Sequence, residues 1–404
     1  MPGSASLAVD RPDRRNLLDR AAGLSFLLLA AALPWSIAPI SIALVLCAAL
    51  TLVRWWAPGG IRWERTPIDL PLLGWLAALA VASAFSLDPS ESFPRVAKGI
   101  VFAAVALGAY HARDPREAKR VLLVLLVSAA AATVYALVRF EREGGAFPVR
   151  VRGLVGHPVT YGGQVTLLAA IGMALVAYGP SRVWRLGAGA FLALLAPAMI
   201  GSATRSAWIA TLVAACVILA RTRARLLPLI AVVAAAAIAL APAHLRERAL
   251  SSFDTKSIWN RERIYMWEAG ARIFRDHPVT GVGLQDLSGI YRRYRSPLAA
   301  EEHGHLHNIV VQVAASMGVV GLAALAWLLA GFARTAGHRW RAPLPRSSLA
   351  SALRLAAVAA LVAILVAGLF EWNLGDEEIA VFLCVVVGMG YAASRWEPPV
   401  ETAA

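Results

Sequence analysis

The chain has 404 residues, of which 59% are hydrophobic, and its mean hydropathy is +0.62. This composition excludes an ordinary soluble protein, because the apolar stretches are continuous and long enough for helices to cross the ~30 Å hydrocarbon core of a bilayer. The net charge of +14 does not point to nucleic acid, since membrane topology accounts for most of the basic residues.

About 12 apolar stretches predict an all-α integral membrane protein, because a helix pairs its backbone groups internally where lipid offers no partner. We treat residues 1–404 as a single polytopic membrane domain. In chain order, the expected spans are 21–34, 37–53, 69–87, 97–111, 119–138, 159–178, 186–201, 206–220, 225–242, 307–332, 350–370 and 378–394.

The basic residues predict that both termini are cytoplasmic. With that orientation, more than half of the 39 Lys and Arg residues fall in cytoplasmic segments, as the positive-inside rule requires. The chain should then lie in a bacterial inner membrane, with the long connection 243–306 between the ninth and tenth spans on the outer face.

The long connection 243–306 carries helical signals. Residues 261–274 place Ile264, Trp267, Ala271 and Phe274 on one stripe at helical spacing, with charged residues opposite. Asp276-His277-Pro278 should end this helix, because a residue before proline disfavours the α region. We expect an amphipathic helix that caps the bundle; a small cap with no catalytic role is the alternative.

Three exported segments bring arginines to the same membrane face. They carry Arg150 and Arg152, Arg205, and Arg261 and Arg263. Guanidinium groups stay charged and bind phosphate oxygens in two-pronged geometry. Each arginine alone could extend toward lipid headgroups, but together they favour an anionic, polyprenyl-pyrophosphate-linked sugar as the ligand.

Residues 303–308 read HGHLHN at the start of the tenth span. A metal site would need at least three well-placed ligands, and His303, His305 and His307 do not share one helical face. Interfacial polarity explains His303 and His305 equally well. His307 opens the apolar run beside Asn308, which could orient its ring or the acceptor, and an imidazole suits general-base catalysis.

A metal-free mechanism is the simpler interpretation. Metal-dependent membrane glycosyltransferases commonly carry a catalytic Asp in the first exported loop, and that loop has no carboxylate here. The next exported loop holds Asp88 and Glu91, which form no ligand pattern. We therefore expect no metal and no cofactor.

Three motifs resemble the O-antigen ligase superfamily. His307-Asn308 is followed by nine residues and then Gly318-x-x-Gly321. Arg263-x-x-x-Trp267 leads into His277-Pro278-x-x-Gly281-x-Gly283, with Trp267 at a position where the family has Leu. The third motif is the arginine of ThrArgSerAlaTrp at 204–208, in a short loop before a span.

The resemblance implies a GT-C-type fold and transfer of a glycan from undecaprenyl pyrophosphate to a sugar of the lipid A–core oligosaccharide. It implies that Arg205 and Arg263 hold the pyrophosphate and that His307 deprotonates the acceptor in an inverting displacement, at a periplasmic active site. Secondary candidates for substrate contact are Arg152, His157, Arg261, His305 and Asn308.

Several related functions stay open at this point. An O-antigen polymerase would use the same donor and transfer it to another lipid-linked repeat unit. A protein O-glycosyltransferase usually carries a further exported region near its carboxyl terminus. A transporter of lipid-linked glycans would place charged residues near the membrane midplane, and the expected spans carry almost none there.

Overall fold

The computed structural model describes residues 14–57, 65–300, 302 and 304–396. Over these residues the chain is helical and has no strand. The α-helices are α1 (Arg14–Ala32), α2 (Ile37–Trp56), α3 (Asp69–Ala84), α4 (Pro89–Val96), α5 (Ala104–His111), α6 (Pro115–Arg142), α7 (Pro158–Tyr178), α8 (Arg182–Gly201), α9 (Arg205–Thr222), α10 (Leu227–Leu240), α11 (Ala243–Leu250), α12 (Ile258–Asp276), α13 (Ser288–Tyr294), α14 (Ile309–Ala336), α15 (Leu349–Ala367) and α16 (Glu377–Ala393). Three 3-10 helices join them: η1 (Ala97–Ala103), η2 (Ala224–Leu226) and η3 (Ser251–Phe253).

Each of the expected spans coincides with a helix. Among the described residues, eight helical segments are long and apolar enough to cross a membrane: α2, α4 through α5 as one unit, α6, α7, α8, α9, α14 and α15. The chain is therefore a multi-pass membrane protein. Four further expected spans fall on α1, α3, α10 and α16, of which α3 and α10 are apolar but shorter.

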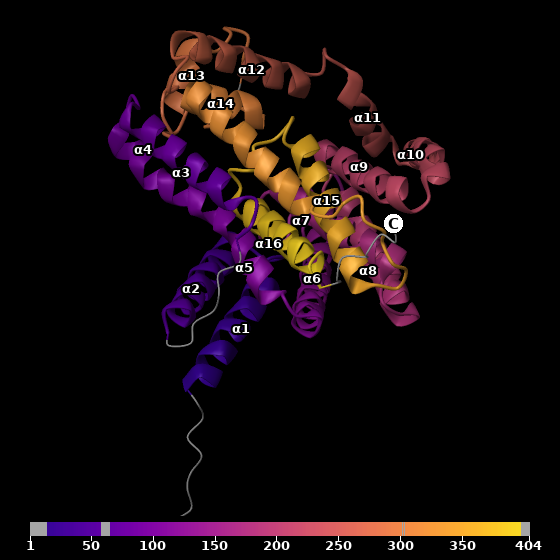
Figure 1. The fold of residues 1–404 in the computed structure, drawn as a ribbon. Coiled ribbons are helices and arrows are strands. Elements are labelled where there is room, and N and C mark those ends of the chain that lie inside the picture. The colour runs from indigo at the N-terminus through magenta and orange to yellow at the C-terminus, as the bar shows by residue number, and fades with distance from the viewer. Residues whose placement is uncertain (1–13, 58–64, 301, 303, 397–404) are drawn as a thin grey trace, which may run out of the picture.

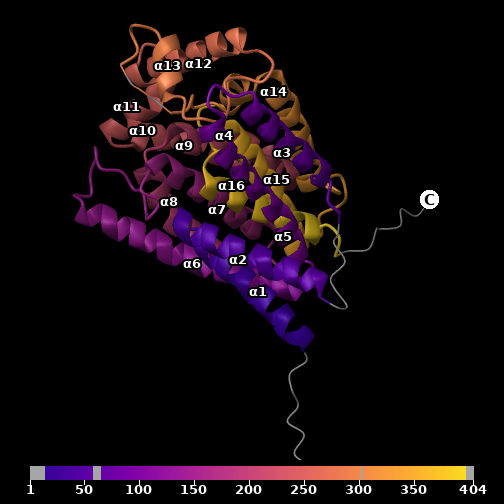
Figure 2. The same ribbon diagram turned by 90° about the vertical axis from the view of Figure 1, so that its left-hand side faces the viewer.

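The centre of the bundle is formed by α7, α15 and α16. Helix α15 packs against α7, α9 and α16, while α16 also packs against α5. Most side chains of these three helices are buried, and many are alanine or glycine, which lets helices approach closely inside a membrane. Helices α1, α2 and α6 lie along one side of this centre (Figure 2).

The long connection between α10 and α14 folds into a cap at one end of the bundle, above α9 and α14 (Figure 1). It contains α11, α12 and α13, and its own apolar cluster includes Met266, Ile273, Tyr291 and Leu306. Helix α12 ends at Asp276, directly before His277-Pro278, as the sequence predicts.

The face of α12 that is buried within the protein is not the predicted apolar stripe. The buried residues are Glu262, Met266, Ala269, Gly270 and Ile273, whereas Ala271 is exposed and Ile264, Trp267 and Phe274 are half-buried. Glu262 lies on this buried face, where its carboxylate accepts a hydrogen bond from the Ala300 amide at 3.0 Å.

The glycine-containing segment after α12 packs against a break within α14 at Gly318. Gly318 interrupts α14 with φ +59°, a conformation that favours glycine. The segment after α12 docks at this break, where Val319 N donates to Pro278 O at 2.8 Å and Gly283 N donates to Ser316 O at 2.9 Å. A Cβ on Gly318 would lie 2.3 Å from Val279 O. The element that approaches Gly318 closely is thus a loop rather than a neighbouring helix.

Candidate functional site

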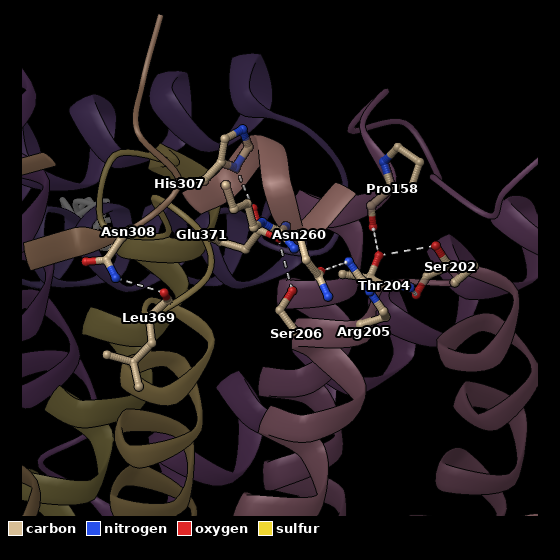
Figure 3. A network of polar contacts seen from close by, with 12 residues as sticks. Pro158, Ser202, Thr204, Arg205, Ser206, Asn260, His307, Asn308, Leu369 and Glu371 are labelled. Atoms are coloured by element: carbon tan, nitrogen blue, oxygen red, sulfur yellow. Dashed lines mark hydrogen bonds and ion pairs between the residues drawn. The ribbon is translucent and has the colours of Figure 1, made fainter. Parts of the chain in front are cut away.

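A buried carboxylate lies at the centre of the candidate site, beneath the cap. Glu371 accepts hydrogen bonds from His307 Nδ1 at 2.8 Å and from Ser206 Oγ at 3.3 Å, and it forms an ion pair with Arg263 (Figure 3). Its side chain is 5% exposed. Burial raises the pKa of Glu371, but the hydrogen bond from His307 and the charge of Arg263 outweigh burial, so this pKa lies below its usual value.

The residues that contact Glu371 come from different helices and loops of the chain. Ser206 lies in the first turn of α9, Arg263 in α12 and Glu371 in the loop between α15 and α16. His307 precedes α14 with φ +47°. Asn308 caps α14, because its side chain accepts from Val310 N at 2.9 Å and Val311 N at 3.0 Å.

Asn308 also ties two of the site's segments together. Its Nδ2 donates to Leu369 O at 2.9 Å, and Ile309 N donates to Gly368 O at 2.8 Å. These bonds hold the start of α14 against the loop that carries Glu371. The contacts of Asn308 are therefore structural, since its side chain bonds to backbone groups and positions His307 through the backbone.

Arginines surround a cavity of about 110 Å³ beside His307. Those in its wall are Arg150, Arg205, Arg248 and Arg263. Arg205 donates to Ser251 Oγ at 3.0 Å and to Asn260 Oδ1 at 2.9 Å, so the first residue of α9 is tied to the cap (Figure 3).

Arg150 and Arg248 are held by the turn between α8 and α9. Arg150 Nε donates to Ser202 O at 2.7 Å, and Arg248 Nε donates to Ala203 O at 2.5 Å. Burial, together with the neighbouring charges of Arg248, Arg205 and Arg263, lowers the pKa of Arg150 to about 10. Burial and the charge of Arg263 also lower the pKa of Arg248. The wall thus holds four arginines and one carboxylate, Glu262, with Glu371 paired to Arg263 close by. Positive charge predominates, so the cavity favours an anion.

The structure separates the members of each predicted arginine pair. Arg263 reaches Glu371, whereas Arg261 is exposed and donates to Tyr265 Oη at 2.6 Å. Arg150 lines the cavity, whereas Arg152 pairs with Glu143 at 3.1 Å. Arg150 thus lies where sequence analysis expected Arg152.

The remaining predicted residues lie around this centre. His157 is the residue before α7, and burial together with the charge of Arg150 lowers its pKa. The rings of His305 and His307 are 4.3 Å apart, centroid to centroid.

Asp88, in the loop between α3 and α4 that is predicted to be exported, accepts a hydrogen bond from Glu91 N at the start of α4, so it caps that helix.

Sequence analysis missed Glu371, Arg248 and Ser206. A topological signal for Glu371 was present: it is a carboxylate in the short connection between the last two spans, on the membrane face predicted for His307. Among the residues that the structure describes, no group of three or more His, Cys, Asp or Glu could hold a metal ion. His303, one of the three histidines considered as metal ligands, lies outside those residues.

The fold and the site together define a multi-pass helical membrane protein with a polar, arginine-rich site at one end of its bundle. Residues 190–326 match the family described as O-antigen ligase, so this part of the chain is similar to that family. The predicted resemblance is confirmed, and the family implies a transferase of lipid-linked glycans. The matched segment contains Arg205, Arg263 and His307 but not Glu371. No curated protein matches the chain significantly.

Proposed function

We propose that the protein is an O-antigen ligase, which transfers a glycan from undecaprenyl pyrophosphate to a sugar hydroxyl of the lipid A–core oligosaccharide. The observation that supports this most strongly is that His307 lines an arginine-rich cavity and is hydrogen-bonded to the buried Glu371 carboxylate. A cationic cavity suits a pyrophosphate, and an imidazole beside it suits deprotonation of an incoming hydroxyl.

Arg205 and Arg263 hold the pyrophosphate in this mechanism, and Arg150 and Arg248 add to the positive field. As the bond from the anomeric carbon to the pyrophosphate oxygen breaks, its electron pair stays on the leaving group. The arginines stabilise that developing charge, which is commonly the largest single contribution to such a reaction. The ion pair with Glu371 fixes the direction of the Arg263 side chain.

His307 is the general base, and Glu371 is its positioning residue. A carboxylate that accepts from Nδ1–H selects the tautomer whose lone pair is on Nε2. The acceptor oxygen attacks the anomeric carbon from the face opposite the leaving group, and Nε2 takes the hydroxyl proton. One displacement of this kind inverts the configuration at the anomeric carbon. It requires no metal and no cofactor.

We further infer a GT-C-type architecture of about 12 spans in a single domain, residues 1–404, with both termini in the cytoplasm. The insertion 243–306 would then cover a periplasmic active site. The basic residues of the predicted cytoplasmic segments support this orientation. Transfer to another lipid-linked repeat unit, as in a polymerase, would use the same donor groups.

The test is transfer of glycan to lipid A–core in membranes of a strain that lacks the chromosomal gene. His307→Ala should lower the transfer rate roughly 10²- to 10⁴-fold, the usual contribution of a general base. His244→Ala is the matched control, because this exposed histidine stacks on Phe147 and does not line the cavity. Full activity of His307→Ala would refute the proposal.

A further inference from the structure

A second cavity lies beside the arginine-lined one, at the same end of the bundle. Its volume is about 380 Å³, within the size range of small-molecule sites. His305 lines this second cavity and His307 lines the first, and their rings are 4.3 Å apart. The histidine pair therefore stands between the two cavities.

The polar groups of the second cavity differ from those of the first. Its charged and amide groups are three carboxylates (Asp376, Glu377 and Glu378), two cations (Arg95, which is paired with Glu91, and Lys98) and two amides (Gln285 and Gln312). Carboxylates repel a phosphate group, whereas carboxylates and amides together offer the acceptors and donors that sugar hydroxyls require. This cavity is thus suited to a neutral polyhydroxyl group rather than to the anionic end of the donor.

One wall of the second cavity is aromatic and apolar. It includes Trp75, Phe102 and Trp372. Trp75 is 3% exposed, and its ring packs edge-on against that of Phe102, with the ring centroids 6.3 Å apart. Sugars present both hydroxyls and apolar C–H faces, so such a wall complements a saccharide.

Asp376 connects the second cavity to the reacting centre. It is half-buried at the residue before α16, and its Oδ2 accepts from Thr160 Oγ1 at 3.1 Å. It is close enough to Glu371 and His307 for their charges to affect its pKa. A hydroxyl bound at Asp376 would approach the histidine pair from the side opposite the arginines.

We propose that the second cavity binds the acceptor saccharide of the transfer reaction, with Asp376 and Gln285 as hydrogen-bonding residues and His305 at the passage toward His307. This inference rests on the proposed transferase activity and assigns its acceptor side. The donor pyrophosphate and the acceptor sugar then occupy separate cavities, so the acceptor hydroxyl can reach the anomeric carbon from the face opposite the leaving group, as an inverting displacement requires.

The test measures transfer at varied concentrations of each substrate with purified protein in proteoliposomes. The donor is undecaprenyl-pyrophosphate-linked glycan, and the acceptor is lipid A–core from a strain lacking the gene. Asp376→Asn and Gln285→Leu should each raise the acceptor KM roughly 10-fold or more, with the donor KM within about twofold of wild type. Asp254→Asn, at an exposed aspartate outside both cavities, is the matched control.

The outcomes separate the two proposals. Wild-type protein that transfers no glycan would refute the transferase function and this inference with it. Transfer with an unchanged acceptor KM in both variants would refute the inference alone, and so would a rise in the donor KM instead, which would assign the cavity to the donor. If Asp376→Asn does not fold, judged by gel filtration, Gln285→Leu decides the question.

Discussion

Glu371→Gln is the most informative change at the site. It keeps the size of the side chain but removes the charge that Arg263 and His307 both contact. Hydrogen bonds to charged groups contribute about 1.5–3 kcal/mol each, so two of them correspond to about 3–6 kcal/mol. Since 1.36 kcal/mol is tenfold in rate, we expect kcat to fall roughly 10²- to 10⁴-fold.

The assay should separate kcat from the donor KM, since a positioning role and a general loss of structure affect them differently. We expect the donor KM to stay within about fivefold of wild type, because the other arginines of the cavity remain. Glu268→Gln is the matched control: its surface ion pair with Arg272 contributes about 0–1 kcal/mol. A Glu371→Gln protein that folds and retains wild-type kcat would refute the role given to this carboxylate.

Three further predictions follow from the same geometry. Arg205→Ala should lower kcat/KM for the donor roughly 10²- to 10³-fold, measured at low donor concentration, while an unchanged value would remove Arg205 from the pyrophosphate site. Burial, together with the charges of Glu378 and Glu371, raises the pKa of Asp376 to about 6, although Thr160 and His307 act in the opposite direction. The ionised form is the better hydrogen-bond acceptor, so the acceptor KM of the wild type should fall as the pH rises through about 6. This dependence should be lost in Asp376→Asn. The other charged or titratable groups in the cavity wall include Glu377, Arg95, Lys98 and His305. Gly318→Ala should destabilise the protein by about 1–3 kcal/mol, because the φ of Gly318 is +59° and the Val279 carbonyl leaves no space for a Cβ. The measurement is the unfolding temperature in detergent, which should fall; an unchanged value would contradict this prediction.

The helices could be predicted from the sequence because their signals are local. Apolar length located the spans, and Asp276-His277-Pro278 located the end of α12. The buried face of α12 could not be predicted in the same way, since two faces of this helix carry apolar residues. On the face that is buried, Glu262 accepts a hydrogen bond from the amide of Ala300, which is 38 residues away along the chain.

The site depended on contacts between distant segments. Glu371 lies 64 residues from His307 and 108 from Arg263 along the chain, so no short motif connects them. Arg150 and Arg152 are equally cationic and two residues apart. The turn between α8 and α9 accepts the hydrogen bonds of Arg150, while Glu143 pairs with Arg152. Only the three-dimensional arrangement distinguishes them.

The most direct test of the proposed function is reconstitution with lipid-linked O-antigen as the donor and lipid A–core as the acceptor, with and without EDTA. We predict a product joined to lipid A–core that forms equally well in both conditions and disappears with His307→Ala. A product extended only on the lipid-linked donor would identify a polymerase. Activity that is lost with EDTA and restored by a divalent cation would contradict the metal-free mechanism.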